Sequence, residues 1–357
     1  MTAVILILVV LGFALLEYKW ASYALNSLGT HFQCDRALAE PGQPITWSAT
    51  VDNYSRLPIP FVRLVQDFPL EAKPQEDSAW QSAYCKRNFL AWYTEYRMTL
   101  RGRRSITRNA TVSFDQRGVY QIGTYRLSAG DLLGFKEAQC HGPGQKIVVM
   151  PHHSQQKKAM DAVGGFLGDV SVRRFILEDP ILTTGFRDYT GREPMRAISW
   201  TRTAQSGTLQ VKQYDHTAEF HVVVLLNTEG ADEAQLEECL RLTRSVCEKL
   251  EQRKIPYGFR TNANLPGPVG KVHTLLEGLG ERHLNTILYG LGCADGTTFH
   301  SFRYLTRQTL KKRKGSESYI VITPDDQGDV RSCIQELSST VGNPVCVLKG
   351  CEGVAQV

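Results

Sequence analysis

The sequence lacks the short motifs that carry the common enzyme chemistries. It holds no G-x-S-x-G nucleophile turn, no H-E-x-x-H metal-binding helix, no phosphate-binding loop and no Cys-His signature. His152 and His153 stand side by side, but no further metal ligand is near them in the sequence. Since no nucleophile with its base can be named, the sequence favours a protein that is not an enzyme. An unrecognised membrane-associated hydrolase is kept as an alternative.

Cysteine pairs at metal-binding spacing are also missing. The nine cysteines are odd in number, and no two of them form a C-x-x-C arrangement. This scatter predicts reduced thiols in a reducing compartment, not a disulfide framework or a zinc site. Strong charge of either sign is lacking too, because the formal net charge is only +5 over 357 residues. That balance gives no reason to expect nucleic acid as a partner.

One long apolar run is present at the amino terminus. Residues 2–16 carry no charge, and apolar residues resume after Glu17 and Lys19. A membrane-spanning helix needs roughly 17 to 25 residues, so we predict a membrane anchor over residues 1–30. A cleaved signal peptide is disfavoured because no basic residue precedes the run. Lys19 follows it and, by the positive-inside tendency, predicts a single-pass protein of the cell membrane whose soluble domains lie in the cytoplasm.

Residues 31–150 are predicted to form an all-β sandwich domain. Short runs of alternating apolar and polar residues are separated by turn residues, at the spacing typical of such folds. The runs are Ile45–Val51, Phe61–Val65, Arg97–Arg101 and Ala110–Phe114, followed by the glycine-containing stretches 117–123 and 131–135. Gly123 and the other glycines of these stretches are expected to serve turns or close backbone approach.

Residues 151–215 are predicted to be a connector. Its first part contains a glycine-rich run, 164–168, that no Lys-Ser or Lys-Thr follows, so it is interpreted as flexible. Its second part, 187–214, is dense in arginine.

Within the arginine-rich part, Pro194 favours a new helix start, because its missing N–H costs nothing at the first helical position. Apolar residues over 197–204 have helical spacing, and Gly207 is a plausible end for the helix. Alternation from Leu209 onward then predicts a strand.

Residues 216–357 are predicted to form a doubly wound α/β domain. Continuous apolar runs at Phe220–Leu226 and Ser318–Thr323 indicate strands buried on both faces of a parallel sheet. Helices are expected over 232–253, 302–310 and 330–341, and further strands over 257–261 and 344–348.

The arginine-rich segment resembles a family hallmark. Eight residues fit the pattern R-x-Y-x(6)-R-x-I-x-W-x(3)-A-x(4)-L-x-V without a gap. They are Arg187, Tyr189, Arg196, Ile198, Trp200, Ala204, Leu209 and Val211. The pattern is similar to that of bacterial proteins with domain of unknown function 58. Three departures exist: Arg192-Glu193 replace a Gly-Asp pair, Ser199 replaces an acid and Gln205 replaces an arginine.

This resemblance implies a membrane-anchored protein in which an immunoglobulin-like sandwich precedes a von Willebrand factor A-like domain. It also implies a partner, because relatives are commonly encoded beside MoxR-type AAA+ ATPases and are thought to act as adaptors. We therefore expect a non-catalytic protein that works with such an ATPase in the assembly or maturation of other proteins. Arg187 and Arg196 are expected to pair with acids above a packed Trp200 and so brace the two domains; docking of an acidic partner is the alternative.

The resemblance further implies a position for a divalent metal, at the carboxyl ends of the α/β strands. The family pattern uses Asp-x-Ser-x-Ser, a threonine and a later aspartate. The corresponding residues are Asn227, Glu229, Ala231, Thr297 and Asp325. Because the first aspartate and both serines are replaced, we expect a degenerate magnesium site without tight metal binding, and no cofactor. Metal-dependent ligand capture is kept as an alternative function.

Overall fold

The computed structural model describes residues 12, 19–20, 22–75, 84–87, 91–130, 137–176, 179–215, 221–267, 270–271, 273–313, 317–341, 343–350 and 354–356. The chain divides into two compact units, residues 1–152 and 153–357. Each unit is described by itself.

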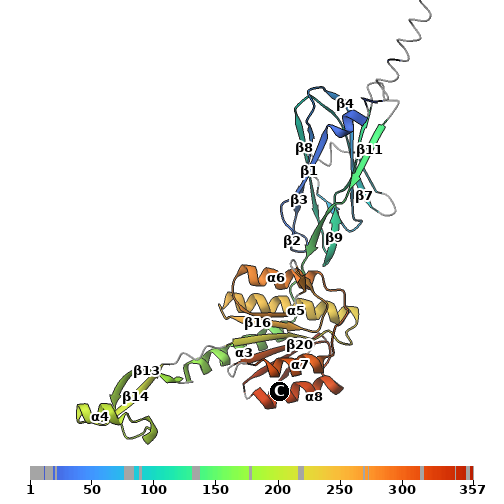
Figure 1. Cartoon of the computed structure of the whole chain (residues 1–357). Coiled ribbons are helices and arrows are strands. Elements are labelled where there is room, and N and C mark those ends of the chain that lie inside the picture. The colour runs from blue at the N-terminus through green and yellow to red at the C-terminus, as the bar shows by residue number, and fades with distance from the viewer. Residues whose placement is uncertain are drawn as a thin grey trace, which may run out of the picture. The chain divides into compact units, whose positions relative to one another are not determined.

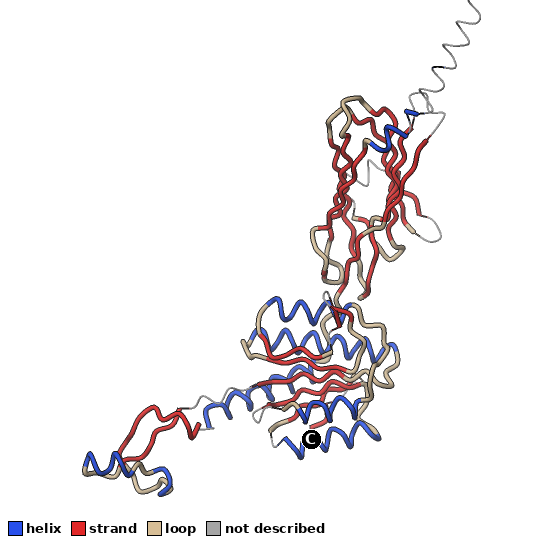
Figure 2. Tube along the Cα trace, in the orientation of Figure 1, coloured by secondary structure: helices blue, strands red, loops and turns tan. Residues whose placement is uncertain are grey.

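The first unit is a β-sandwich, as predicted from its alternating runs (Figure 2). One sheet has the order β1 (Leu28–Cys34), β3 (Ile45–Asn53), β8 (Ser105–Ser113) and β5 (Lys73–Pro74). The second has the order β11 (Glu137–Gly142), β10 (Thr124–Gly130), β4 (Ile59–Phe68), β7 (Trp92–Leu100) and β6 (Tyr84–Arg87). A small third sheet contains β2 (Leu38–Ala39), β12 (Gln145–Val149) and β9 (Gly118–Ile122).

The sandwich core forms because every second side chain of a strand points to the same face. Along β3, Ile45, Trp47, Ala49 and Val51 are buried while the residues between them are partly exposed. Ala49 and Val51 pack in one cluster with residues of β4, β7 and β10, so the two large sheets share a core.

Trp47 is the largest fully buried side chain of the sandwich. Its indole stacks on Phe32, with 5.7 Å between ring centroids and 11° between planes. Gly123 lies against the same ring: it has a φ of 71°, and an added Cβ would meet Trp47 Cζ2 at 2.1 Å. The expected role of Gly123 in close backbone approach is confirmed.

The residues that follow Lys19 belong to the sandwich, which corrects the predicted extent of the anchor. Ala24 is fully buried in the sandwich core, and Trp20, Leu25 and Leu28 pack against it. Strand β1 begins at Leu28, inside the predicted 1–30 anchor. Residues 1–11 and 13–18, which carry most of that prediction, lie outside the described residues, as does the stretch 131–135. Over the part of the chain that the structure describes, no helix combines the length and the apolar character needed to cross a bilayer.

The glycine-rich run of the second unit is helical, so the prediction of a flexible connector was wrong. Helix α3 (Lys157–Ile176) includes the whole run. Its Ala159, Val163 and Leu167 are buried, and Gly164 leaves room for the Lys249 side chain, whose Nζ donates to the Met160 carbonyl. Packing against the α/β sheet and α5 thus outweighs the low helix propensity of glycine.

The second unit contains the predicted α/β sheet, in the order β19 (Thr274–Gly278), β16 (Tyr257–Thr261), β15 (His221–Leu226), β20 (Glu317–Thr323), β21 (Val345–Lys349) and β22 (Val354–Gln356). The four central strands are parallel, and both edge strands are antiparallel to their neighbours. Figure 1 shows α5 (Glu233–Gln252) and α6 (Glu281–Gly292) on one face and α7 (Phe302–Lys311) and α8 (Gly328–Val341) on the other. Helices covering both faces explain the continuous apolar runs.

Connections from β15 run first to β16 on one side and later to β20 on the other side. The carboxyl ends of β15 and β20 therefore flank the point where the strand order reverses, which is where open α/β sheets bind ligands. The edge strand β19 and helix α6 were not predicted from the sequence.

The arginine-rich segment forms a hairpin of β13 (Asp179–Asp188) and β14 (Gln210–Asp215). Between the strands come a short 3₁₀ helix (Met195–Ala197) and α4 (Trp200–Ser206). Gly207 ends α4 with a left-handed φ of 75°, which confirms it as the stop. The pairing of β14 with β13 was not foreseen.

Candidate functional site

Buried polar side chains gather at the carboxyl ends of β15, β16 and β20. Asn227 is fully buried, and Thr228, Asn262 and Thr323 are at most 2% exposed. Buried polar groups need hydrogen-bond partners, and the side chains of Asn227, Asn262 and Thr323 bond to one another, whereas over the described residues the buried Thr228 hydroxyl has no partner.

Asn227 is the centre of this network. Its Nδ2 donates to Thr323 Oγ1 at 3.0 Å, and its Oδ1 accepts from Asn262 Nδ2 at 2.8 Å and from the Glu229 backbone N–H at 3.0 Å. The side chain thus ties β15 to both of its neighbours in the sheet. Its oxygen already accepts two hydrogen bonds, the full capacity of a carbonyl oxygen.

Glu229 points to the start of α7. Its Oε2 accepts from the Phe302 backbone N–H at 2.6 Å, next to the N-cap residue Ser301. A carboxylate there complements the positive end of the helix dipole. Glu229 therefore anchors a helix, a role that the metal-site pattern did not predict.

Thr297 belongs to a local network with an acid that the sequence analysis missed. Asp295 Oδ1 accepts from the Thr297 N–H at 2.9 Å and from its hydroxyl at 2.6 Å, and Asp295 Oδ2 accepts from Asn264 Nδ2 at 3.0 Å. Burial raises the pKa of the Asp295 carboxyl, but these hydrogen bonds outweigh burial, and the pKa is lowered overall.

The remaining acid of the pattern, Asp325, follows β20. Its Oδ1 accepts from the Asp326 N–H at 2.6 Å, and its carbonyl accepts from Thr323 Oγ1 at 2.7 Å. Within the described ranges, no three His, Cys, Asp or Glu side chains come together in a way that could hold a metal ion. The weak metal binding expected at this edge stays a prediction, and the hydrogen bonds of Asn227 and Glu229 support it.

A pocket of about 360 Å³ adjoins this edge of the sheet. Asn262 is part of its wall, and two ring pairs flank it: His273 with Phe299, and His300 with Tyr304, whose centroids lie 4.6 and 4.4 Å apart. No sequence pattern predicted this pocket, because its rings come from separate loops and the start of α7.

The hairpin places the eight motif residues in two groups. Ile198 and Val211 are 5% and 2% exposed and form an isolated β-bridge, so they make the hairpin's small core. Tyr189 donates its N–H to the Leu209 carbonyl at 2.8 Å and closes the strands. The other side chains of the motif are exposed to solvent.

Arg187 pairs with an acid, as expected, but the acid belongs to the same hairpin. Its Nη1 donates to Glu193 Oε1 at 2.6 Å. Glu193 also accepts from the Thr190 N–H at 3.1 Å and from the Thr190 hydroxyl at 2.8 Å. Arg187 therefore stabilises the loop that follows β13.

Two details of the expected brace are wrong. Trp200 is 61% exposed and does not pack beneath the arginines. Arg196 is exposed, and over the described residues it has no ion-pair or hydrogen-bond partner for its side chain. Arg202 lies over the ring of Phe186, with 5.0 Å from Cζ to the centroid. Whether the segment braces two domains stays a prediction.

The loop that Glu193 stabilises is expected to keep its hydrogen bonds down to low pH. Hydrogen bonds from Thr190 and from the Arg187 side chain lower the pKa of Glu193 from 4.5 to about 2. Because the folded-state pKa is depressed, the loop's stabilisation is complete above the ordinary pKa and is lost as the pH falls through about 2. An NMR titration of the Thr190 amide should therefore show its midpoint near that pH. Arg187→Ala should raise the midpoint, whereas Arg202→Ala should not; equal effects of the two would contradict the assignment.

Comparison with known proteins does not assign a family. No protein-family model and no curated protein matches the chain. Solved structures similar to part of it include a mutant of Salmonella alpha-2-macroglobulin, with 13% identity and a TM-score of 0.28. Others are the CARDB domain of a Pyrococcus furiosus protein (10%, 0.22) and a non-cellulosomal cohesin from Archaeoglobus fulgidus (12%, 0.23).

These structures match only a limited part of the chain. The matches cover 35%, 34% and 37% of this chain and 9%, 91% and 96% of the respective other chains. The chain thus spans about a tenth of the length of the macroglobulin. Likeness at this level carries no argument about function.

Proposed function

We propose that this chain is a membrane-anchored, non-catalytic adaptor that docks an acidic protein partner through its arginine-rich hairpin. The observation that carries the proposal is the exposure of large apolar side chains among the arginines. The exposed fractions are 39% for Phe186, 66% for Met195, 61% for Trp200 and 43% for Leu209. Aromatic residues, methionine and arginine are the residue types enriched at protein interfaces.

The hairpin is held in shape by its own hydrogen bonds. The strand pairing runs from Asp179–Asp215 to Asp188–Gln210, and the Ser199 N–H donates to the Gln210 carbonyl at 2.8 Å. The Gln210 N–H in turn donates to Thr203 Oγ1 at 3.0 Å. A surface that is ordered before binding loses less entropy when a partner docks, which favours its use as an interface.

Charge indicates the chemistry of the partner. The whole hairpin, residues 179–215, has five basic and four acidic side chains, but Asp179 and Asp215 are paired at its open end, so residues 185–213 hold all five basic side chains with only two acidic ones. One of the two acids, Glu193, is neutralised by Arg187. The exposed Arg192, Arg196 and Arg202 are therefore available to carboxylates of a partner, which they can bind bidentately.

The family resemblance supplies the candidate partner. We assign the chain, on its eight-residue motif, to the bacterial proteins with domain of unknown function 58, and its α/β unit to the von Willebrand A-like domains. The central parallel sheet covered by helices on both faces is compatible with that assignment. The partner is then a MoxR-type AAA+ ATPase, and the process is the assembly or maturation of other proteins.

The predicted membrane anchor completes the proposal. The uncharged run 2–16 is the membrane-inserted part, and Lys19 keeps the soluble units on the cytoplasmic side.

Metal-dependent ligand capture has less support, because side-chain oxygens of Asn227 and Glu229 already accept hydrogen bonds from backbone and side-chain donors of this chain.

Binding of the full chain to the candidate ATPase tests the hairpin surface. Arg196→Ala and Trp200→Ala should each weaken the complex by roughly tenfold or more, because both side chains are exposed in the free protein and would be buried by a partner. Neither change should lower the thermal unfolding temperature, since neither removes a contact of the described core. Affinity can be measured by biolayer interferometry with and without ATP.

Arg282→Ala on α6 is the matched control, because Arg282 is also exposed but lies outside the hairpin. It should leave the affinity unchanged. The docking proposal fails if the unaltered chain forms no complex or if all three variants bind alike. A fall in unfolding temperature with Arg196→Ala would instead favour the brace between domains.

A further inference from the structure

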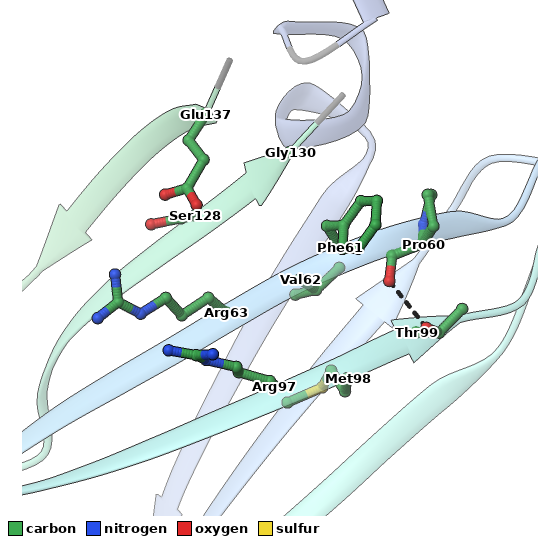
Figure 3. Close-up of a pocket in the computed structure, with 10 residues that line it drawn as sticks. All are labelled: Pro60, Phe61, Val62, Arg63, Arg97, Met98, Thr99, Ser128, Gly130 and Glu137. Carbon is green, nitrogen blue, oxygen red and sulfur yellow. Dashed lines mark hydrogen bonds between the residues drawn. The ribbon is translucent and has the colours of Figure 1, made fainter. Parts of the chain in front are cut away.

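A second site lies on the outer face of the five-stranded sheet of the sandwich. It is a pocket of about 530 Å³, within the usual range of small-molecule sites, and strands β4, β7, β10 and β11 line it. Figure 3 shows the side chains of Arg63 and Arg97 next to each other on neighbouring strands, with Glu137 across the pocket. This pocket has no part in the adaptor function proposed above.

The strand register places like charges directly opposite each other. Arg97 on β7 is the Cα partner of Arg63 on β4, and Ser128 on β10 is the partner of Arg63 on the other side. Like charges at directly opposite positions destabilise a sheet, so such a pair needs compensation.

Glu95, two residues before Arg97 on β7, provides this compensation. Its side chain is 7% exposed, and its carboxylate accepts from Arg63 Nε at 3.0 Å, from Arg63 Nη2 at 3.2 Å and from Arg97 Nε at 2.7 Å. Burial raises the pKa of this carboxyl, but the hydrogen bonds and charges of both arginines outweigh burial, and the pKa is lowered overall. Glu95 is therefore ionised at neutral pH and cancels one of the two positive charges.

Most N–H groups of the two arginines are available to a ligand. A guanidinium has five N–H groups, of which Arg63 uses two and Arg97 one for Glu95. Over the described residues, no other hydrogen bond is made by either side chain. One uncompensated positive charge and seven N–H donors thus remain on two side chains that line the pocket, an arrangement that suits a phosphate or carboxylate group.

The opposite edge of the pocket has the reverse charge. Glu137 is exposed at the start of β11 and has no ion-pair partner among the described residues. An apolar edge is formed by Phe61 on β4, which is 53% exposed where the β4–β7 register shifts between Ile59 and Val62. Thr99 Oγ1 donates to the Pro60 carbonyl at 2.8 Å and so holds the irregular part of β4 against β7.

We propose that the pocket binds a zwitterion whose anionic group lies on Arg63 and Arg97 and whose protonated amine lies on Glu137. A simple anion would face the Glu137 carboxylate, and a simple cation would face the arginines. A phosphoethanolamine group carries both charges, and an acyl chain or another apolar group attached to it would lie against Phe61. The source of this chemistry is either a soluble phosphoethanolamine compound or the headgroup of a lipid.

Calorimetric titration of the full chain tests the site with three probes: phosphoethanolamine, inorganic phosphate and ethanolamine. Phosphoethanolamine should bind more tightly than the other two. Arg97→Gln should weaken phosphoethanolamine and phosphate by about tenfold, since it removes charge-assisted hydrogen bonds. Arg97 is 80% exposed, so its loss leaves the fold intact. Glu137→Gln should weaken phosphoethanolamine only.

Arg126→Gln is the matched control, because Arg126 lies on β10 and pairs with Asp67 outside the pocket. It should change no affinity. The proposal is overturned if no probe binds, if phosphate binds as tightly as phosphoethanolamine, or if Arg126→Gln weakens binding as much as Arg97→Gln. Dihexanoyl phosphatidylethanolamine then separates the sources: tighter binding than phosphoethanolamine indicates a lipid, and weaker binding indicates a soluble compound.

Discussion

Asn227→Asp is expected to lower the free energy of unfolding by about 3 to 5 kcal/mol, the cost of an uncompensated buried charge. The substitution keeps the shape of the side chain and restores the first acid of the metal-site pattern. It removes the Nδ2 donor to Thr323, however, and puts a negative charge at a fully buried position beside Glu229. Urea denaturation followed by circular dichroism measures the loss.

Asn285→Asp is the control for this change, because Asn285 is exposed on α6 and should tolerate a charge with little effect. Magnesium gives a second readout. By mass action an ion that binds only the folded state stabilises it, so magnesium should recover part of the loss in Asn227→Asp and leave the unaltered chain unchanged. Stabilisation of the unaltered chain by magnesium would show that the site is not degenerate.

Trp47→Ala is expected to lower the free energy of unfolding by about 3 to 5 kcal/mol, the usual cost of removing a large buried aromatic side chain. Trp47 is 0% exposed, stacks on Phe32 and packs against residues from both sheets. The cavity left behind cannot close without moving strands that hydrogen bonds hold in register. Thermal or chemical unfolding of the full chain measures the effect on the sandwich transition.

Gly123 allows a stricter version of this test. Gly123→Ala should be strongly destabilising in the unaltered chain, because its Cβ would meet the Trp47 ring at 2.1 Å. In the Trp47→Ala background the same change should cost only about 1 kcal/mol, the backbone strain of a positive φ. Gly42→Ala is the control: Gly42 has a similar φ of 77° but nothing within 4 Å of an added Cβ. If Gly42→Ala and Gly123→Ala were equally costly, the Trp47 contact would not explain the cost.

Local patterns in the sequence predicted β3, β4, β7 and β8 of the sandwich, the four parallel strands of the α/β sheet, and helices α5, α7 and α8, but not β1, β10, β11, β12 or β13. The alternation from Ile45 to Val51 corresponds to β3, and the periodic stretch after Asp232 corresponds to α5, whose N-terminus is fixed by the Asp232–Gln235 capping box. These elements follow from one segment's own side-chain pattern, which a single sequence displays directly.

Features that depend on distant segments were missed. Helix α3 contains three glycines that local propensity disfavours, and only its packing against β21 and α5 explains it. Asn262 lies 35 positions from Asn227, so no spacing in the sequence links the two side chains that share a hydrogen bond. The motif identified Trp200 but could not tell whether its ring is buried, because a spaced pattern of residues is compatible with a core or with an interface.

The junction between Lys19 and β1 decides how freely the sandwich can turn. Helical residues 22–26 pack on the sandwich through Ala24 and Leu25, and a single turn at Ser27 leads into the strand. Over the described residues 22–28, that turn alone joins the helix to the strand, without a flexible tether of several residues. The short helix 22–26 therefore moves with the sandwich as one body. If the preceding run is held in a bilayer, as we propose, the sandwich would stay close to the membrane surface, and a partner would meet it there.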